Sequence, residues 1–205
     1  MKTSFVVTGT DTGIGKSVFS AALTQALAAR YWKPIQSGLE DETDTGFVER
    51  MVPGSTLPEA WRLVTPASPH LAAEIDGVTI DPDALEPPQV DGPLVIEGAG
   101  GALVPVTRQT LYADVFARWQ IPVIVCARTA LGTINHSLMT IEALKARGVP
   151  IHGIAFIGEA MADSEATIPA LAGVRRLGRL DWLPELSPDT LATGFAAGFD
   201  IADFA

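Results

Sequence analysis

The chain has 205 residues, of which 47% are hydrophobic and 19% charged, and this fits one domain with a substantial core. Its 14 lysines and arginines against 24 aspartates and glutamates give a net charge of −10, which disfavours nucleic acid and anionic membranes as partners. The single cysteine excludes an internal disulfide. We expect no leader and no membrane-length apolar run, so the sequence predicts a cytoplasmic protein.

Apolar runs typical of buried strands alternate with segments of helical periodicity along the chain. We expect strands near Phe5–Thr8, Tyr31–Ile35, Leu94–Glu97, Val123–Ala127, Ile154–Ile157 and Val174–Leu180. We expect helices at Lys16–Arg30, Asp44–Met51, Leu111–Trp119, Thr133–Arg147 and Glu165–Leu171. Near-continuous apolar strands separated by helices indicate an α/β domain with a parallel sheet covered by helices on both faces.

Residues 53–93 are rich in proline and show only weak periodicity. We expect an irregular covering segment with short helices there, so residues 1–205 form one domain and not two. Cys126 lies within an apolar run, which predicts a buried strand thiol and not a nucleophile.

A glycine-rich turn follows the first predicted strand and ends in Gly15-Lys16-Ser17. Glycines let backbone N–H groups converge on an anion, the lysine adds charge for the β- and γ-phosphates, and the serine offers a hydroxyl to Mg²⁺ as a helix begins. The loop is a variant, because Thr10 stands where the strict pattern has glycine and Gly9 is one position earlier. A turn that binds nothing is the alternative, but the flanking strand and helix favour a phosphate-binding loop of an NTPase-like fold.

Two further charged residues end predicted strands, where ligands gather in sheets of this kind. Glu97 ends an apolar strand and is followed by three glycines in four positions, which suits a magnesium or phosphate site; a solvated loop glutamate is the alternative. Lys33 precedes Pro34 at the end of the second strand. It is either a charge that stabilises a transferred phosphoryl group or an exposed strand-end lysine.

Several motifs succeed one another along the chain: Gly9–Ser17, Lys33–Gly38, Ala67–His70, Glu97–Gly101 and Leu131–His136. Their types and order resemble those of dethiobiotin synthetases over nearly the whole chain. The resemblance implies a P-loop NTPase-like domain and an ATP- and Mg²⁺-dependent ligase of biotin biosynthesis, which converts 7,8-diaminononanoate and CO₂ into dethiobiotin, ADP and phosphate. In that family ATP phosphorylates a substrate carbamate, which the second amine attacks. No enzyme nucleophile is required, and the chain offers no serine–histidine or cysteine constellation for one.

The resemblance also implies roles for the matching residues. Lys16 and Lys33 would be catalytic and flank the γ-phosphate and the carbamate. Ser17, Asp44 and Glu97 would bind magnesium, with Asp41 as the rival of Asp44, and the acidic run 40–44 could instead be a solvated helix start. The other nucleotide-binding residues would be Gly13, Ile14, Gly15, Gly98, Ala99, Gly100, Ile157, Trp182 and Leu183.

Substrate recognition, by the same resemblance, would involve a homodimer with the site at the subunit interface. The substrate contacts would be Thr12, Lys33, Ser37, Ser68, Pro69 and, from the second subunit, Thr133, Ile134 and Asn135. The last three begin a predicted helix, whose free N–H groups and dipole favour a carboxylate. His70 and His136 show no spacing that suggests a metal site, so we expect packing roles for both.

The chain departs from the family pattern beside the expected base site. Ile157-Gly158 stands where many relatives have an Asn-Asp pair that reads adenine, so we expect other nucleoside triphosphates to serve besides ATP. Gly13 also replaces a frequent glutamate, and the short link at 29–33 predicts a trimmed second strand. Two other functions stay open at this point: a P-loop nucleotide switch or partitioning ATPase, and a synthetase-like domain of an amidotransferase.

Overall fold

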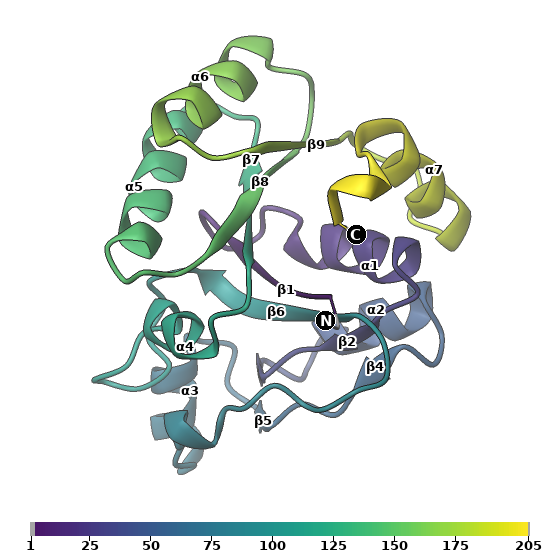
Figure 1. Ribbon diagram of the computed structural model, residues 1–205. Helices are drawn as coiled ribbons and strands as arrows, with labels where there is room; N and C mark the ends of the chain where they lie inside the picture. Colours follow the sequence, from purple (N-terminus) through teal and green to yellow (C-terminus); the bar gives the residue numbers. More distant parts are fainter. Residues whose placement is uncertain (1–2, 205) are drawn as a thin grey trace.

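A parallel seven-stranded sheet with the strand order β4-β2-β6-β1-β7-β8-β9 forms the centre of the computed structural model, which describes residues 3–204 (Figure 1). Every pair of neighbouring strands in this sheet is parallel, as the sequence predicts. The strands are β1 (Ser4–Gly9), β2 (Arg30–Trp32), β4 (Thr56–Leu57), β6 (Leu94–Gly101), β7 (Val123–Arg128), β8 (Ile151–Ile157) and β9 (Arg176–Leu180).

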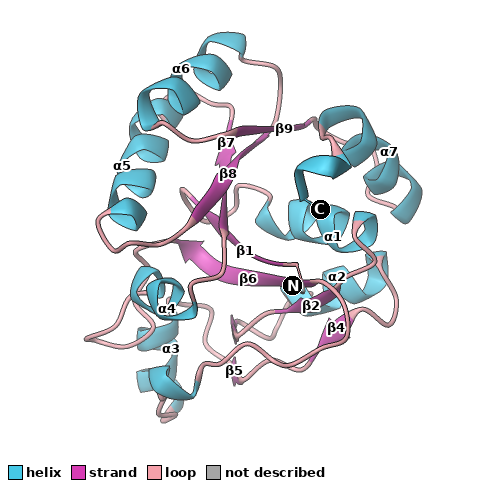
Figure 2. Ribbon diagram, in the orientation of Figure 1, coloured by secondary structure: helices cyan, strands magenta, loops and turns pink. Residues whose placement is uncertain are grey.

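Helices cover both faces of this sheet (Figure 2). One face carries α1 (Lys16–Ala26), α2 (Asp44–Met51) and α7 (Pro188–Gly198). The other carries α3 (Pro69–Asp76), α4 (Tyr112–Trp119), α5 (Thr133–Lys145) and α6 (Ala162–Ala172). Within residues 3–204 no helix is long and apolar enough to cross a bilayer.

The alternation of side chains along each strand explains why the strands are apolar throughout. Val6 packs in the core beneath α3 to α6, whereas Phe5 and Val7 pack in the core beneath α1, α2 and α7. Cys126 is buried in β7, as predicted, and burial raises the pKa of its thiol above the usual cysteine value. Such a thiol is poorly suited to act as a nucleophile.

The predicted strand Tyr31–Ile35 is wrong in one respect, because the chain leaves the large sheet in its middle. β2 ends at Trp32, and β3 (Ile35–Ser37) pairs with β5 (Trp61–Leu63) in a separate two-stranded sheet. Pro34 lies between them and has no N–H for a ladder, while its carbonyl accepts hydrogen bonds from the N–H groups of Ala60 and Trp61. Lys33 therefore occupies the junction between the two sheets.

The segment 53–93 is more regular than its composition predicts. It contains β4, β5, α3 and a 3₁₀ helix, η1 (Pro82–Ala84), all packed on the same domain. Arg30 fastens the short β4 to β2, because its guanidinium donates to the carbonyls of Ser55 and Thr56 at 2.9 Å each. A two-residue strand held by a side chain from its neighbour leaves no periodic signal in the sequence.

Several predicted boundaries also need correction. The first helix ends at Ala26 and not at Arg30, since Ala28 adopts a left-handed conformation (φ 48°) that turns the chain into β2. The helix predicted to begin at Leu111 begins at Tyr112, and the helix predicted to end at Arg147 ends at Lys145. The helix predicted at Glu165–Leu171 is longer and spans Ala162–Ala172. The last strand begins at Arg176 and not at Val174.

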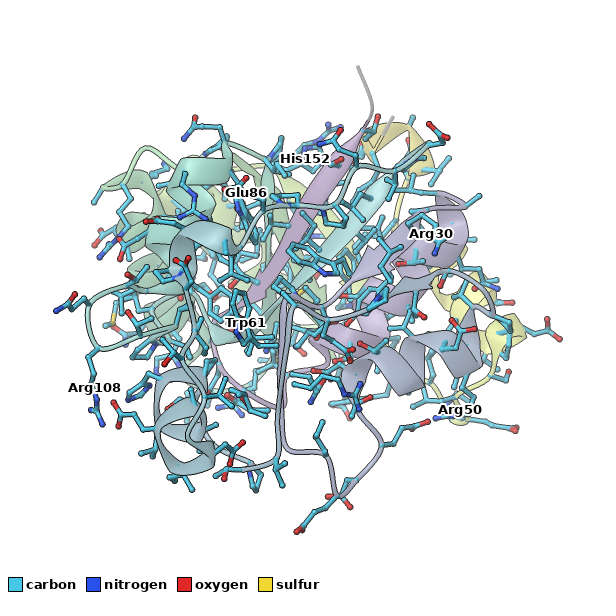
Figure 3. All side chains as sticks on the ribbon, turned by 90° about the horizontal axis from the view of Figure 1, so that it is seen from below. Arg30, Arg50, Trp61, Glu86, Arg108 and His152 are labelled. Atoms are coloured by element: carbon cyan, nitrogen blue, oxygen red, sulfur yellow. The ribbon has the colours of Figure 1, made fainter. Side chains whose placement is uncertain are left out.

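The carboxyl-terminal elements α7 and η2 (Ile201–Phe204) were not predicted. The start of α7 carries a readable signal: Ser187 caps the helix by accepting a hydrogen bond from the Thr190 N–H, and Pro188 occupies the first turn. Phe204 of η2 packs against Phe5 and against His152, which lies near the amino end of β1 (Figure 3). These contacts close the core beneath α1 and α7.

Candidate active site

The glycine-rich loop connects β1 to α1 at the carboxyl end of the sheet. Gly13 and Gly15 adopt positive φ angles of 68° and 93°, which favour glycine. A Cβ on Gly9 would lie 2.7 Å from Ile14 Cδ1, 3.0 Å from Lys16 Cδ and 3.2 Å from the Asp11 carbonyl oxygen, so a larger residue there would displace atoms of the loop. The side chain of Ile14 is buried in the core, and this anchors the loop.

Lys16 begins α1 and its side chain folds back over this loop. Its Nζ donates to the Asp11 carbonyl oxygen at 2.9 Å. Burial lowers the pKa of Lys16, and the nearby charge of Lys33 acts in the same direction, whereas Glu97 and Asp44 oppose both. No carboxylate in the described part of the chain forms an ion pair with Lys16, so this lysine is available to an anionic ligand.

Ser17, Asp44 and Glu97 converge from three different elements. The Ser17 hydroxyl lies 2.6 Å from Asp44 Oδ1 and 2.9 Å from Glu97 Oε1. One hydroxyl proton cannot satisfy two carboxylates at once, and a hard divalent cation would resolve this conflict. Among the described residues no group of three or more His, Cys, Asp or Glu side chains could hold a metal by itself, so this set of hydroxyl and carboxylate oxygens would need phosphate oxygens or water to complete it.

Lys33 completes the cluster from the junction between the sheets. Its Nζ lies 2.6 Å from Asp44 Oδ2 and 3.2 Å from Glu97 Oε1, and it donates to the Gly98 carbonyl at 2.9 Å. Burial acts to lower the pKa of Lys33, but the two carboxylates outweigh it and hold that pKa above the usual lysine value. Conversely, burial acts to raise the pKa of Asp44, and Lys33 and Ser17 outweigh it, so the pKa lies below its usual value.

The acidic run 40–44 separates into distinct environments. Glu42 is exposed and pairs with Arg50, which projects from α2 (Figure 3). Asp41 is exposed and lines the same cavity as Asp44. Asp44 lies in the first turn of α2, and Thr43 is the N-cap of this helix. The backbone N–H of Asp44 donates to Gln36 Oε1 at 3.2 Å. The structure therefore brings Asp44, and not Asp41, into contact with Ser17 and Lys33.

A cavity of about 960 Å³ extends from the glycine-rich loop to the segment that precedes α3. Predicted residues that line it are Thr12, Gly13, Gly15, Lys16, Ser17, Lys33, Ser37, Asp44, Ser68, Pro69, Glu97, Ala99 and Gly100. Gly98 is buried behind this lining and contributes the carbonyl that binds Lys33. The Ser37 hydroxyl is buried without a hydrogen-bond partner among the described residues, so it is free to bind a ligand.

The predicted residues at the start of α5 do not line this cavity. Thr133 is buried and its hydroxyl has no hydrogen-bond partner in the described part of the chain, while Asn135 is exposed and Ile134 is half-buried. A second hollow of about 480 Å³ lies nearby between the glycine-rich loop and α5, and His136 lines it. His70 takes a local role, with its Nδ1 3.1 Å from the Ser68 hydroxyl.

The expected base site lies on the other side of the loop, outside the large cavity. Ile157 packs against the loop, since a Cβ on Gly15 would lie 3.0 Å from Ile157 Cγ2. The Gly158 N–H donates to the Leu180 carbonyl at 2.9 Å, and its carbonyl accepts from Arg179 Nη1 at 2.7 Å. Trp182 is 67% exposed, and Leu183 is half-buried beneath α7.

The sequence did not reveal two side chains that touch the charged cluster. Tyr31 donates to Glu97 Oε2 at 3.0 Å, and Gln36 accepts from the Asp44 N–H. Gln36 lies inside the motif Lys33–Gly38, which could have drawn attention to it. Tyr31 is read from the sequence only as a core residue of β2.

The strand–loop–helix connection, its lysine and serine, and the carboxylate that ends β6 define a P-loop NTPase-like domain. Residues 3–190 match the family model described as "AAA domain". Solved structures with the same fold include a ParA family ATPase from Chlorobium tepidum (TM-score 0.54, 14% identity, 100% of this chain and 93% of that one) and the MinC:MinD complex of Aquifex aeolicus (TM-score 0.55, 12% identity, 94% and 86%).

Similarity over the full length is much stronger to proteins named ATP-dependent dethiobiotin synthetase BioD. The protein of Sphingopyxis alaskensis is 67% identical, with 98% of this chain and 99% of that protein covered. Those of Novosphingobium aromaticivorans (99% and 100% covered) and Agrobacterium fabrum (100% and 98% covered) are 65% and 60% identical. The chain belongs to the dethiobiotin synthetase family, as its motifs suggested.

The buried cluster predicts a large effect of Lys33 on stability. Lys33→Met leaves the carboxylates of Asp44 and Glu97 without their cation, so the free energy of unfolding in metal-free buffer falls by about 3 kcal/mol or more. Arg50→Met removes an ion pair in which both side chains are about half exposed to solvent, so it should leave the free energy of unfolding nearly unchanged. Urea unfolding measures both changes, and equal losses in the two variants would contradict the cluster's role.

Proposed function

We propose that this protein catalyses the ATP-dependent conversion of 7,8-diaminononanoate and CO₂ into dethiobiotin, ADP and phosphate, a ring closure in biotin biosynthesis. The observation that carries the proposal is the meeting of the phosphate-binding loop, Lys33 and the free hydroxyl of Ser37 in one cavity. Full-length similarity to dethiobiotin synthetases supports the same activity. The likeness to the ParA family and MinC:MinD structures, at 14% and 12% identity, concerns the fold alone, so it does not favour a partitioning ATPase.

The reaction must bring two anions together, the γ-phosphate of ATP and a substrate carbamate. Lys16 and Lys33 supply the positive charge that this approach requires. Lys33 stays protonated through neutral pH, because Glu97 and Asp44 raise its pKa. Lys16 would exchange the Asp11 carbonyl for phosphate oxygens, while the loop N–H groups around Gly13 and Gly15 bind the triphosphate.

Magnesium, when bound, would neutralise phosphate charge and orient the γ-phosphate for transfer. Ser17, Asp44 and Glu97 would hold it, since their oxygens are the hard ligands that Mg²⁺ prefers and two carboxylates now compete for one hydroxyl proton. Gly98, Ala99 and Gly100, which directly follow Glu97, would also contact the nucleotide.

The diamine would bind beside Lys33, with Thr12, Ser37, Ser68 and Pro69 around it. Ile157 does not line this cavity, so the base of the nucleotide would lie outside it. The carboxylate of the substrate would reach the start of α5 of a second subunit.

We further propose that the start of α5 serves the site of a second subunit, in a cytoplasmic homodimer. Thr133, Ile134 and Asn135 lie outside their own chain's cavity. Leu131, next to them, is fully exposed, and Leu103 and Met139 are 47% and 59% exposed beside the hollow of about 480 Å³. A second copy would cover these apolar side chains. A solution mass of one chain, measured by light scattering at micromolar concentration, would contradict the dimer.

The decisive assay contains the protein, ATP, Mg²⁺, bicarbonate and 7,8-diaminononanoate. We expect dethiobiotin by mass spectrometry in amounts that match the ADP released. ATP hydrolysis that is independent of the diamine, without dethiobiotin, would contradict the proposal and favour a nucleotide switch.

Neutralising either lysine should reduce turnover strongly. Lys16→Gln and Lys33→Gln each remove charge that acts on the transferred phosphoryl group, so kcat should fall by roughly 10²- to 10⁴-fold. Lys16→Gln should also weaken ATP binding, because Lys16 belongs to the phosphate-binding loop. Steady-state kinetics and calorimetry with ATP separate these effects, and near-normal turnover of Lys33→Gln would remove Lys33 from the reaction.

Activity should depend on Mg²⁺ or Mn²⁺ and vanish with a chelator. Asp44→Asn removes a charged oxygen that contacts Ser17, so the Mg²⁺ concentration for half-maximal turnover should rise by at least about tenfold. Asp41→Asn, a matched change in the same cavity, should shift it by less than twofold. If Asp41→Asn had the larger effect, Asp41 would be the ligand.

We expect weak discrimination among nucleoside triphosphates. The side chain of Ile157 has no polar group, and the N–H and carbonyl of Gly158 already bond to Leu180 and Arg179. Strong selectivity requires polar groups that a wrong base would leave unpaired, and an exposed aromatic ring such as Trp182 can stack on any base. Turnover with ATP, CTP and GTP at equal concentrations tests this, and a preference for ATP above about a hundredfold would overturn it.

A further inference from the structure

Glu97 is held by donors that divide between its two carboxylate oxygens. Oε1 accepts from the Ser17 hydroxyl at 2.9 Å and from Lys33 Nζ at 3.2 Å. Oε2 accepts from the Tyr31 hydroxyl at 3.0 Å, which is its one hydrogen bond from a side chain within residues 3–204. The side chain of Glu97 is 1% exposed, so no bulk water replaces these donors.

The sheet explains why Tyr31 reaches this oxygen. Tyr31 of β2 pairs with Val95 of β6, and Glu97 lies two residues farther along the same strand. Because side chains alternate along a strand, Val95 and Glu97 point to the same face, and Tyr31 packs on that face as well. The phenol therefore extends along β6 toward the carboxyl end of the sheet, where its hydroxyl reaches Oε2 of Glu97.

We propose that Tyr31 is a positioning residue that orients Glu97 for divalent cation binding. The inference rests on the proposed function, in which Glu97 is a magnesium ligand. A hydrogen bond to Oε2 fixes the rotation of the carboxylate plane, so that Oε1 faces Ser17 and Lys33. Partners that hold a ligating side chain from behind commonly change metal affinity by 10- to 100-fold when they are removed.

A simple packing role is the competing explanation, because Tyr31 is fully buried in the core beneath α1 and α2.

Tyr31→Phe separates the two explanations, since it keeps the ring and removes only the hydroxyl. Tyr112→Phe is the matched control: Tyr112 is also fully buried, but its hydroxyl has no hydrogen-bond partner among the described residues. The probe is Mn²⁺, titrated into protein saturated with a non-hydrolysable ATP analogue, with free Mn²⁺ measured by electron paramagnetic resonance.

We expect Mn²⁺ affinity to fall about 10- to 100-fold in Tyr31→Phe and by less than twofold in Tyr112→Phe. The Mg²⁺ concentration for half-maximal turnover should rise by the same factor in Tyr31→Phe, while kcat recovers at saturating Mg²⁺. Analogue binding in the presence of chelator should match that of the unmodified protein. The change in melting temperature on adding Mn²⁺, measured for each variant against its own metal-free form, keeps the comparison valid if Tyr31→Phe is less stable.

Glu97→Gln distinguishes a failure of this inference from a failure of the proposed function. If Glu97→Gln weakens Mn²⁺ binding and Tyr31→Phe leaves it within twofold of the unmodified protein, Tyr31 only packs and the positioning role is overturned. If neither variant weakens Mn²⁺ binding, Glu97 is not a ligand, and the metal site and the role of Tyr31 are overturned together.

Discussion

The ammonium group of Lys33 between the carboxylates of Asp44 and Glu97 is the interaction on which the arrangement of the site depends. Lys33 and Glu97 are 64 residues apart in the chain. Lys33 lies at the junction between the two sheets, Glu97 lies in β6, and Asp44 lies in the first turn of α2. Any one of these charges would be costly to bury alone. Together they join β6, α2 and the junction between the two sheets at one point.

The two lysines of the site differ in electrostatic state, and the difference suits different tasks. Lys33 forms ion pairs with the two carboxylates, which fix its position and raise its pKa, so its amine stays protonated. Within residues 3–204, the Nζ of Lys16 hydrogen-bonds only to a backbone carbonyl, and burial lowers the pKa of this lysine. Lys33 thus helps to hold the cavity together before any ligand arrives, whereas Lys16, in the proposed function, would gain its strongest partner from the phosphates of the nucleotide.

The proposed base side of the site differs from the side of the glycine-rich loop in its contacts. Ile157 supports the loop by apolar packing, and Gly158 uses its polar backbone groups within the sheet and with Arg179. The charged side chains and hydrogen-bond donors therefore gather around the loop, whereas few lie beside Ile157. In the proposed function, the binding energy of a nucleotide would come mainly from its phosphates, so the affinity would depend little on the base.

The sequence predicts the parallel α/β fold, the phosphate-binding loop and which charged residues are candidates for the site, because these depend on local patterns: apolar strands, glycines before a lysine, and carboxylates at strand ends. It failed where distant segments decide the outcome. The break of the second strand at Pro34, the small sheet of β3 and β5, and the early end of α1 at Ala26 follow from how the chain must pack on other elements. The contact with Ser17 that distinguishes Asp44 from Asp41 exists only in the folded chain. The same is true of the hydrogen bond from the phenol of Tyr31 to Glu97, 66 residues away. Hydrogen bonds between side chains so far apart in the chain leave no periodic trace, since their geometry exists only once the sheet has formed.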